Sequence, residues 1–393
     1  MRIRRISGDE RLTTSFPLQS YAFDSSPTDH PVSPAYRDFL PYHSGNVTLV
    51  VEDGGITVAA ASAIPMRQNI RGRVVPMAGI AGVASHPLVR RQGHVRTVLN
   101  QIMGEMRDEG HPVAALYPFR PSFYARFGFV DLPSQRTATF SPADLGELMR
   151  ADLPGEVRWR RIADGYPDWR ELTLRLMDHH HGFAVFPEFR AVSVRDDQKW
   201  LVTAHVDGVV VGALAYRVED HLADLTGDTL LHTGPLGRSL LLGFLGRHVD
   251  QVARIRLWLM PADTPELWAT DLAVETTTAV KIPGSAAPMA RVLSLEGLDG
   301  IAAGPAAITL DVVDDPFVAG RYRLDGRGGA LAVDRVDDRP AATLTAAGLS
   351  ALVYGVLDPV EIALRGLGTL SAEAADALRT LFPARAPFVF AGF

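Results

Sequence analysis

The stretch between Val74 and Glu109 constrains the fold most, because it joins a strand to a helix through a basic, glycine-containing loop. The β-like run, residues 74–85, contains Gly79 and Gly82, and such glycines usually mark a bulge or a close approach of a ligand to the backbone. The loop, residues 88–96, leads into a segment whose apolar residues recur at helical spacing: Val95, Val98, Leu99, Ile102, Met103 and Met106. This order predicts an α/β unit with the loop at the N-terminus of a helix.

The loop has the features of a phosphate-binding site. Backbone N–H groups at a helix start bind anions, Gly93 lets a phosphate approach closely, and Arg90 and Arg91 neutralise its charge. A short motif also matches by chance, so the alternative interpretation is an ordinary exposed loop. Its place between a glycine-interrupted strand and an amphipathic helix favours the phosphate site.

An aromatic segment, residues 117–129, follows the helix and ends in Tyr124-Ala125-Arg126-Phe127-Gly128-Phe129. A tyrosine hydroxyl held beside a leaving group can supply it with a proton, which makes Tyr124 a candidate general acid. The alternative is that Tyr124 is one of several packed core aromatics. The occurrence of both signatures in this order favours a catalytic role.

The remaining patterns predict three domains: residues 1–150, 151–288 and 289–393. In the first, Asp53-Gly54-Gly55 predicts a hairpin between two strands. The second repeats the strand–turn–strand and helix–strand order of the first but lacks its basic glycine loop, and a Pro- and Gly-rich linker, residues 283–288, precedes the third. The predicted elements outside the first domain are strands 200–206, 209–218, 255–260, 306–313, 320–324, 330–333 and 341–345, and helices 169–180, 236–252, 347–354 and 371–382.

Composition excludes several kinds of site. The chain has no cysteine, so thiolate nucleophiles, disulfides and thiolate zinc sites are ruled out. The net charge of −6 gives no electrostatic footprint for nucleic acid. His179-His180-His181 is interpreted as a solvated helix end, and we expect no metal. Without an apolar run after the basic N-terminus or a membrane-length segment elsewhere, we expect a cytoplasmic protein that does not bind membranes.

The C-terminal tail is apolar: Ala386-Pro387-Phe388-Val389-Phe390-Ala391-Gly392-Phe393. Ends of this kind are normally held against a core. Burial beside aromatic surface raises the pKa of a carboxylate above its ordinary range, which would make it a better base. The alternative is a terminus that only docks.

These motifs together resemble the Eis (enhanced intracellular survival) family of GNAT N-acetyltransferases. The resemblance rests on Val83-Ala84-Ser85-His86, the spacing Arg90-x-x-Gly93-x-Val95, the Tyr124 turn, a second unit without the loop, and a tail that ends in Phe. It implies two tandem GNAT-like units and a sterol-carrier-like α+β unit. It also implies that acetyl-CoA is bound by Val83, Ala84, Arg90, Arg91, Gln92, Gly93, His94 and Val95, although which arginine meets the pyrophosphate stays open.

The resemblance further implies Tyr124 as general acid, the carboxylate of Phe393 as general base, small-molecule or lysine-type amines as acceptors, and a homo-hexamer. Asp24 is a candidate for holding a cationic acceptor, with a helix-cap or turn role as the alternative. Gly392 stands where family members that acetylate aminoglycosides have an acidic residue, so aminoglycosides are not singled out. The competing hypothesis is a non-catalytic binding protein that carries an apolar ligand in its C-terminal unit.

Overall fold

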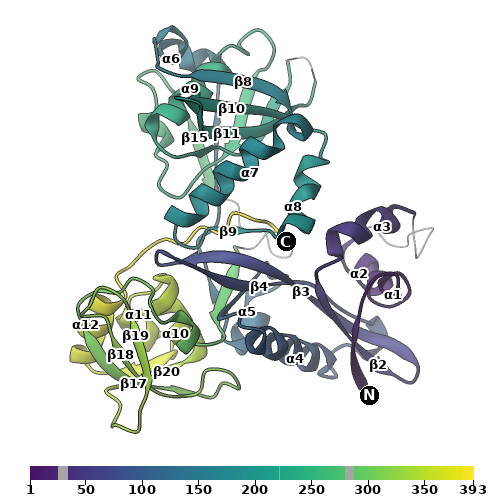
Figure 1. The fold of residues 1–393 in the computed structure, drawn as a ribbon, viewed down its shortest axis with the longest axis vertical. Helices are drawn as coiled ribbons and strands as arrows, with labels where there is room; N and C mark the ends of the chain where they lie inside the picture. Colours follow the sequence, from purple (N-terminus) through teal and green to yellow (C-terminus); the bar gives the residue numbers. More distant parts are fainter. Residues whose placement is uncertain (25–33, 221, 279–286) are drawn as a thin grey trace. The chain divides into compact units, whose positions relative to one another are not determined.

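A computed structural model describes residues 1–24, 34–220, 222–278 and 287–393. Its internal contacts divide the chain into two compact units (Figure 1). The first comprises residues 1–133, 181–191 and 282–393, and the second comprises residues 134–180 and 192–281. The predicted linker, residues 283–288, lies mostly outside the described residues.

The first unit contains a twisted sheet with the strand order β1-β2-β3-β4-β5-β16-β6, and β9 pairs with β3. The predicted hairpin is confirmed, since Asp53 pairs with Ile56 across the glycine turn. The strands are β1 (Arg2–Ile6), β2 (Val47–Asp53), β3 (Ile56–Ile70), β4 (Arg73–Ser85), β5 (Val113–Leu116), β6 (Val130–Asp131), β9 (Ala184–Val185) and β16 (Met289–Val292).

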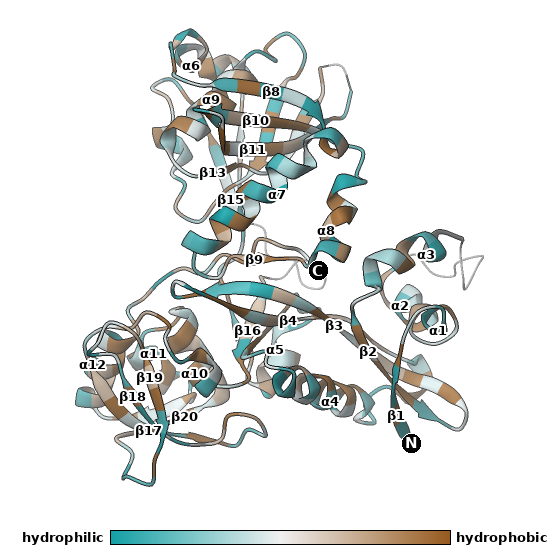
Figure 2. Ribbon diagram, in the orientation of Figure 1, coloured by the Kyte–Doolittle hydropathy of each residue, from teal (hydrophilic) through white to brown (hydrophobic). Residues whose placement is uncertain are grey.

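One face of this sheet packs against α4 (His94–Asp108). Hydrophobic residues gather on the buried side of this helix, as the spacing predicted, and hydrophilic residues colour its other side (Figure 2). Short helices occupy the N-terminal region, the loop between β4 and α4, and the turn after β5: α1 (Glu10–Thr13), α2 (Ser15–Phe23), α3 (Pro34–Phe39), α5 (Pro121–Tyr124), and the 3₁₀ turns η1 (Leu40–His43), η2 (Pro87–Val89) and η3 (Ala125–Phe127).

The C-terminal part of the first unit is a five-stranded sheet of order β19-β18-β17-β20-β21 with three helices. Its core is continuous with the face of the first sheet opposite α4. The elements are η6 (Glu296–Leu298), β17 (Ala307–Val313), β18 (Gly320–Asp325), β19 (Ala332–Arg335), β20 (Ala342–Thr345), α10 (Ala346–Tyr354), α11 (Pro359–Leu364), β21 (Gly368–Leu370) and α12 (Ala372–Leu381).

The second unit contains a sheet of order β15-β7-β14-β12-β11-β10-β8, to which β13 adds by pairing with β11. The predicted strands at 200–206 and 209–218 are present. The elements are β7 (Arg136–Phe140), η4 (Pro142–Leu145), α6 (Gly146–Arg150), β8 (Glu156–Arg161), α7 (Ile162–His179), α8 (Glu188–Arg195, whose first turn belongs to the first unit), β10 (Trp200–Val206), β11 (Val209–Val218), β12 (Asp224–Thr229), β13 (Leu231–His232), α9 (Pro235–Gly246), β14 (Arg254–Trp258), η5 (Pro265–Leu267) and β15 (Glu275–Thr278).

Two strands lie in sheets that their position in the chain does not suggest. β16 follows the second unit in sequence but fills the gap between β5 and β6 in the first sheet. β7 precedes the second domain predicted from the sequence, residues 151–288, but lies between β14 and β15 in the sheet of the second unit. Neither sheet is therefore built from one continuous stretch of the chain. The domain boundaries near residues 150 and 288 remain predictions from the sequence.

The expectation of a solvated end at His179-His180-His181 is wrong for His181, whose side chain is only 3% exposed. Its Nδ1 accepts the N–H of Arg71 at 3.0 Å, and its Nε2 lies 3.1 Å from the carbonyl of Tyr354. The described residues contain no cluster of His, Asp and Glu able to hold a metal. Within the same ranges, every helix is too short or too polar to span a bilayer.

Candidate active site

The site begins where β4 and β5 separate. These parallel strands pair only from Met77 to Ile80 on β4, whereas β4 itself continues to Ser85. Val83 and Ala84 therefore lie on a stretch whose β5 side has no strand partner among the described residues. Backbone N–H and C=O groups on that side are available to a ligand. The separation thus provides an opening in the sheet for an extended group.

Gly82 marks a bulge in this stretch. Its φ of +60° favours glycine, and the pairing of β3 with β4 shifts register beside it. The side chain of Gln19 on α2 donates to the Gly82 carbonyl at 3.0 Å. The bulge predicted from the sequence is confirmed at Gly82, while Gly79 lies in regular pairing between Ile64 and Ala115.

The basic loop lies between β4 and α4. Arg91 and Gly93 both have positive φ, at 66° and 91°, and Gly93 caps α4 without a side-chain hydrogen bond. The first bond into the helix runs from the N–H of Thr97 to the Gly93 carbonyl, so the preceding N–H groups have no partner inside the helix. A helix of this length with open N–H groups fits a phosphate.

The arginines of the loop are exposed, and no carboxylate of the described residues pairs with Arg90, Arg91 or Arg96. The guanidinium of Arg90 lies 5.8 Å from the ring centre of Tyr21 on α2. Gln92 is exposed and Val95 packs against the α4 core. Both ring nitrogens of His94 are shielded from solvent without a hydrogen-bond partner in the described chain.

Tyr124 ends α5 directly after β5. Its side chain is 3% exposed and lies edge-on to Phe119, Phe123 and Phe129 at 5.5, 5.1 and 6.2 Å between ring centres. None of the described residues forms a hydrogen bond with its hydroxyl. Burial raises the pKa of Tyr124, so the hydroxyl keeps its proton at neutral pH and can donate it.

The ring of Phe393 packs on the sheet face opposite α4, against Tyr117 and Phe186 at 5.4 and 6.4 Å. The hydroxyl of Tyr117 donates to the Ala391 carbonyl at 3.3 Å. Further back, the ring of Phe390 stacks on Phe183 at 4.8 Å. The predicted docking of the tail is therefore confirmed.

Tyr117 and Phe186 were not singled out from the sequence. Tyr117 carried a usable signal, because it directly follows β5 at the edge where β4 and β5 separate. Phe186 carried none, since its contact with the tail depends on the pairing of β9 with β3. Both residues line the position of Phe393.

Asp24 follows α2 and is exposed, and its N–H donates to the Ser20 carbonyl. No hydrogen bond or ion pair of the described chain joins it to Tyr124 or Phe393. The structure thus brings together the β4 opening, the basic loop and Tyr124, with Phe393 on the other face of the same sheet. Asp24 directly follows α2, whose Gln19 contacts the bulge at Gly82 and whose Tyr21 contacts Arg90 of the basic loop.

Comparison with known proteins identifies this arrangement. Residues 2–130 match the acetyltransferase (GNAT) domain family, and residues 291–390 match the sterol carrier protein domain family. The N-acetyltransferase Eis of Mycobacterium bovis is 32% identical over 109 residues, which are 24% of this chain and 27% of that protein. The chain thus spans about a quarter of the length of this curated relative.

Two solved structures share the whole architecture. A GCN5-related N-acetyltransferase from Kribbella flavida covers 100% of this chain and 98% of its own, with a TM-score of 0.81 and 24% identity. Eis1 from Mycobacterium abscessus covers 100% of both chains, with a TM-score of 0.76 and 18% identity. The predicted fold class is confirmed: two GNAT-like sheets and a sterol-carrier-like α+β part. Residues 2–130 therefore form a GNAT acetyltransferase domain, and part of the chain is similar to the N-acetyltransferase Eis.

Proposed function

We propose that the protein is an N-acetyltransferase that moves the acetyl group of acetyl-CoA directly to an amine. The observation that carries this proposal is the combination, in one unit, of the opening between β4 and β5, the basic loop before α4 and the protonated Tyr124. Acetyl-CoA supplies the thioester and the pyrophosphate. The open N–H groups at the start of α4 and the exposed arginines fit the pyrophosphate.

The chain's own groups supply the remaining chemistry. Backbone N–H near Val83 and Ala84 stabilises the oxyanion that forms on the thioester carbonyl. The C-terminal carboxylate of Phe393 takes a proton from the ammonium of the acceptor, the neutral amine attacks the thioester carbonyl, and Tyr124 protonates the departing thiolate. Holding both reactants in one site supplies on the order of 7–11 kcal/mol, so no covalent enzyme intermediate is required.

The two faces of the sheet suit two reactants. Tyr124 belongs to the core on the α4 side, where the basic loop lies, and Phe393 packs on the opposite face. A thioester that reaches the opening from the α4 side meets an amine that arrives from the Phe393 side. We further propose a cytoplasmic homo-hexamer with small amines or lysine side chains as acceptors and Asp24 at the acceptor entrance.

Thiol release from acetyl-CoA with a panel of amines tests the function. Removing a general acid lowers kcat by about 10²- to 10⁴-fold, which is the loss expected for Tyr124→Phe. A one-residue C-terminal extension, which displaces the carboxylate, should also lower kcat. Tyr216→Phe, which removes a buried hydroxyl in the second unit, is the matched control and should retain activity.

The competing hypothesis gives a different result. A protein that carries an apolar ligand in its sterol-carrier-like part would bind lipid stoichiometrically and turn over no amine in the panel. That outcome overturns the enzyme proposal. Equal activity of wild type and Tyr124→Phe would instead retain the function and remove Tyr124 from its mechanism.

A further inference from the structure

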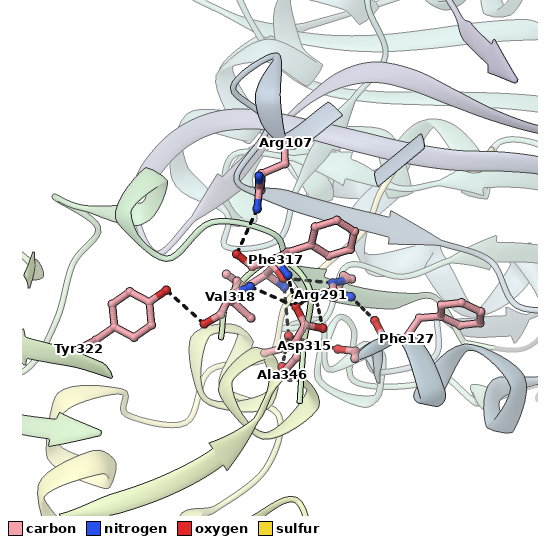
Figure 3. Close-up of polar contacts among 11 residues, drawn as sticks. Arg107, Phe127, Arg291, Asp315, Phe317, Val318, Tyr322 and Ala346 are labelled. Atoms are coloured by element: carbon pink, nitrogen blue, oxygen red, sulfur yellow. Dashed lines mark hydrogen bonds and ion pairs between the residues drawn. The ribbon is translucent and has the colours of Figure 1, made fainter. Parts of the chain in front are cut away.

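A buried arginine lies directly behind the turn that carries Tyr124. Arg291 is on β16, the strand inserted next to β5, and its side chain is 1% exposed. Its Nη1 donates to the carbonyl of Phe127 and its Nη2 to both carboxylate oxygens of Asp315 at 2.9 Å (Figure 3). Its Nε donates to the carbonyl of Val292 at 3.1 Å. Every nitrogen of the guanidinium is used.

Asp315 is as fully engaged as its partner. Its side chain is 6% exposed, and Oδ1 also accepts the N–H groups of Phe317 and Val318 at 2.9 and 3.1 Å. The carbonyl of Phe317 in turn accepts from Arg107 on α4 at 3.3 Å (Figure 3). The pair therefore connects α4, the Tyr124 turn and the loop between β17 and β18.

The Tyr124 turn depends on this support. Phe127 lies three residues after Tyr124, and Gly128 adopts a φ of +77° that closes the turn. A side chain at Gly128 would place its Cβ 2.8 Å from the Cβ of Ala346 and 3.3 Å from Nη1 of Arg291. The backbone of the turn at Gly128 thus packs closely against both Arg291 and the start of α10.

We propose that Arg291, fixed by Asp315, is a positioning residue that sets the place of the Tyr124 hydroxyl during catalysis. The inference rests on the function proposed above and adds a role for a part of the chain outside the GNAT domain match. The sterol-carrier-like part would then act on the reaction through Asp315 as well as through the tail.

The chemistry explains why arginine occupies this position. A buried ion pair contributes little net stability, because both charges lose their hydration. The planar guanidinium of Arg291, however, donates to Phe127, Asp315 and Val292 at once and in fixed directions. A lysine ammonium on a flexible stem cannot do this. Arg291→Lys should therefore keep the charge and lose the geometry.

Kinetics of Arg291→Lys, alone and combined with Tyr124→Phe, test the proposal. Misplacing a catalytic group by about 1 Å costs up to about 100-fold, so we expect a 10- to 100-fold loss of kcat with a nearly unchanged KM for acetyl-CoA. In the Tyr124→Phe background the same substitution should cause no further loss. Hydrogen exchange of the peptide 120–130 should rise in Arg291→Lys.

Arg11→Lys is the matched control, because Arg11 is a buried arginine of the same unit that donates to Asn46 and Thr48 instead. Any loss it causes should multiply with that of Tyr124→Phe and leave exchange at 120–130 unchanged. If Arg291→Lys does not fold, Asp315→Asn, which keeps the shape of the partner, replaces it with the same expected results.

Multiplicative losses for Arg291→Lys and Tyr124→Phe, or unchanged exchange at 120–130, overturn the positioning role while leaving the transferase intact. A wild type that acetylates no amine overturns the proposed function, and with it the catalytic part of this inference. These two failures are distinguished by the activity of the wild type alone.

Discussion

The ring of Phe393 meets the ring of Tyr117 edge-on, with 5.4 Å between centres and an angle of 78° between planes. Tyr117 directly follows β5, so Phe393 is placed against the edge where β4 and β5 separate. The hydroxyl of the same tyrosine donates to the Ala391 carbonyl. One side chain therefore fixes the tail by both its ring and its hydroxyl.

Tyr117→Phe separates these two contacts, because it keeps the ring and removes the hydrogen bond to Ala391. A net hydrogen bond contributes about 1 kcal/mol, so we expect the tail to loosen and kcat to fall about 5-fold. The KM for acetyl-CoA should stay the same, since the loop lies on the other side of the sheet. Steady-state kinetics check this, and a changed acetyl-CoA KM with normal kcat would contradict it.

Arg90→Ala and Arg91→Ala, made singly, decide which arginine meets the pyrophosphate. A hydrogen bond to a charged group contributes about 1.5–3 kcal/mol, so the contacting residue should raise the KM for acetyl-CoA about 10- to 100-fold. The other should change it by less than about 3-fold and lose that effect in added salt. Arg327→Ala, at an exposed arginine of the sterol-carrier-like part, is the control. Unchanged KM in both loop variants removes the two arginines from the site.

Local sequence patterns predicted the elements around the site because their signals are short-range. The glycine turn at Asp53, the bulge at Gly82 and the helix after Gly93 each follow from a few neighbouring residues. The helix predicted to end at Val252 ends at Gly246 instead. Apolar periodicity alone does not fix where a helix ends.

What the sequence did not predict depends on partners far apart in the chain. Arg291 appears as one arginine at the start of the third predicted domain, yet β16 inserts it beside β5 and behind the Tyr124 turn. His181 appears as the end of a polar helix, but it accepts from Arg71 in a buried network. The apolar residues of α2 are distributed around the whole helix, so apolar periodicity does not predict this helix.

His181 gives the first unit a pH-dependent stability. Burial lowers its pKa from 6.5 to about 4, so the imidazole is neutral in the folded chain and takes up a proton more readily when unfolded. Its contribution is present above pH 6.5 and is lost as the pH falls toward 4, on the order of 3 kcal/mol. His181→Asn, which keeps an acceptor for Arg71, should flatten this acid decline.

Denaturant unfolding at pH 7.5, 6, 5 and 4.5 measures this decline, and His179→Asn, at an exposed neighbouring position, should leave it unchanged. His43, whose pKa burial also lowers to about 4, keeps part of the slope in both variants. Identical slopes for wild type and His181→Asn would show that His181 does not titrate as described.

Gly79→Ala tests whether the position of the Phe393 ring on the sheet matters for catalysis. An added Cβ would lie 2.6 Å from the sulfur of the buried Met66, which must shift, and 3.3 Å from the Phe393 ring, which must give by a few tenths of an ångström. Overpacking of this kind costs about 1–3 kcal/mol. Because Met66 and Phe393 pack in the same apolar cluster, these shifts should displace the tail, and kcat should fall more than the melting temperature suggests. Gly104→Ala, whose Cβ would meet Phe317 at an ordinary 3.5 Å, is the control. A Gly79→Ala enzyme with wild-type kcat would show that the position of the tail does not limit the reaction.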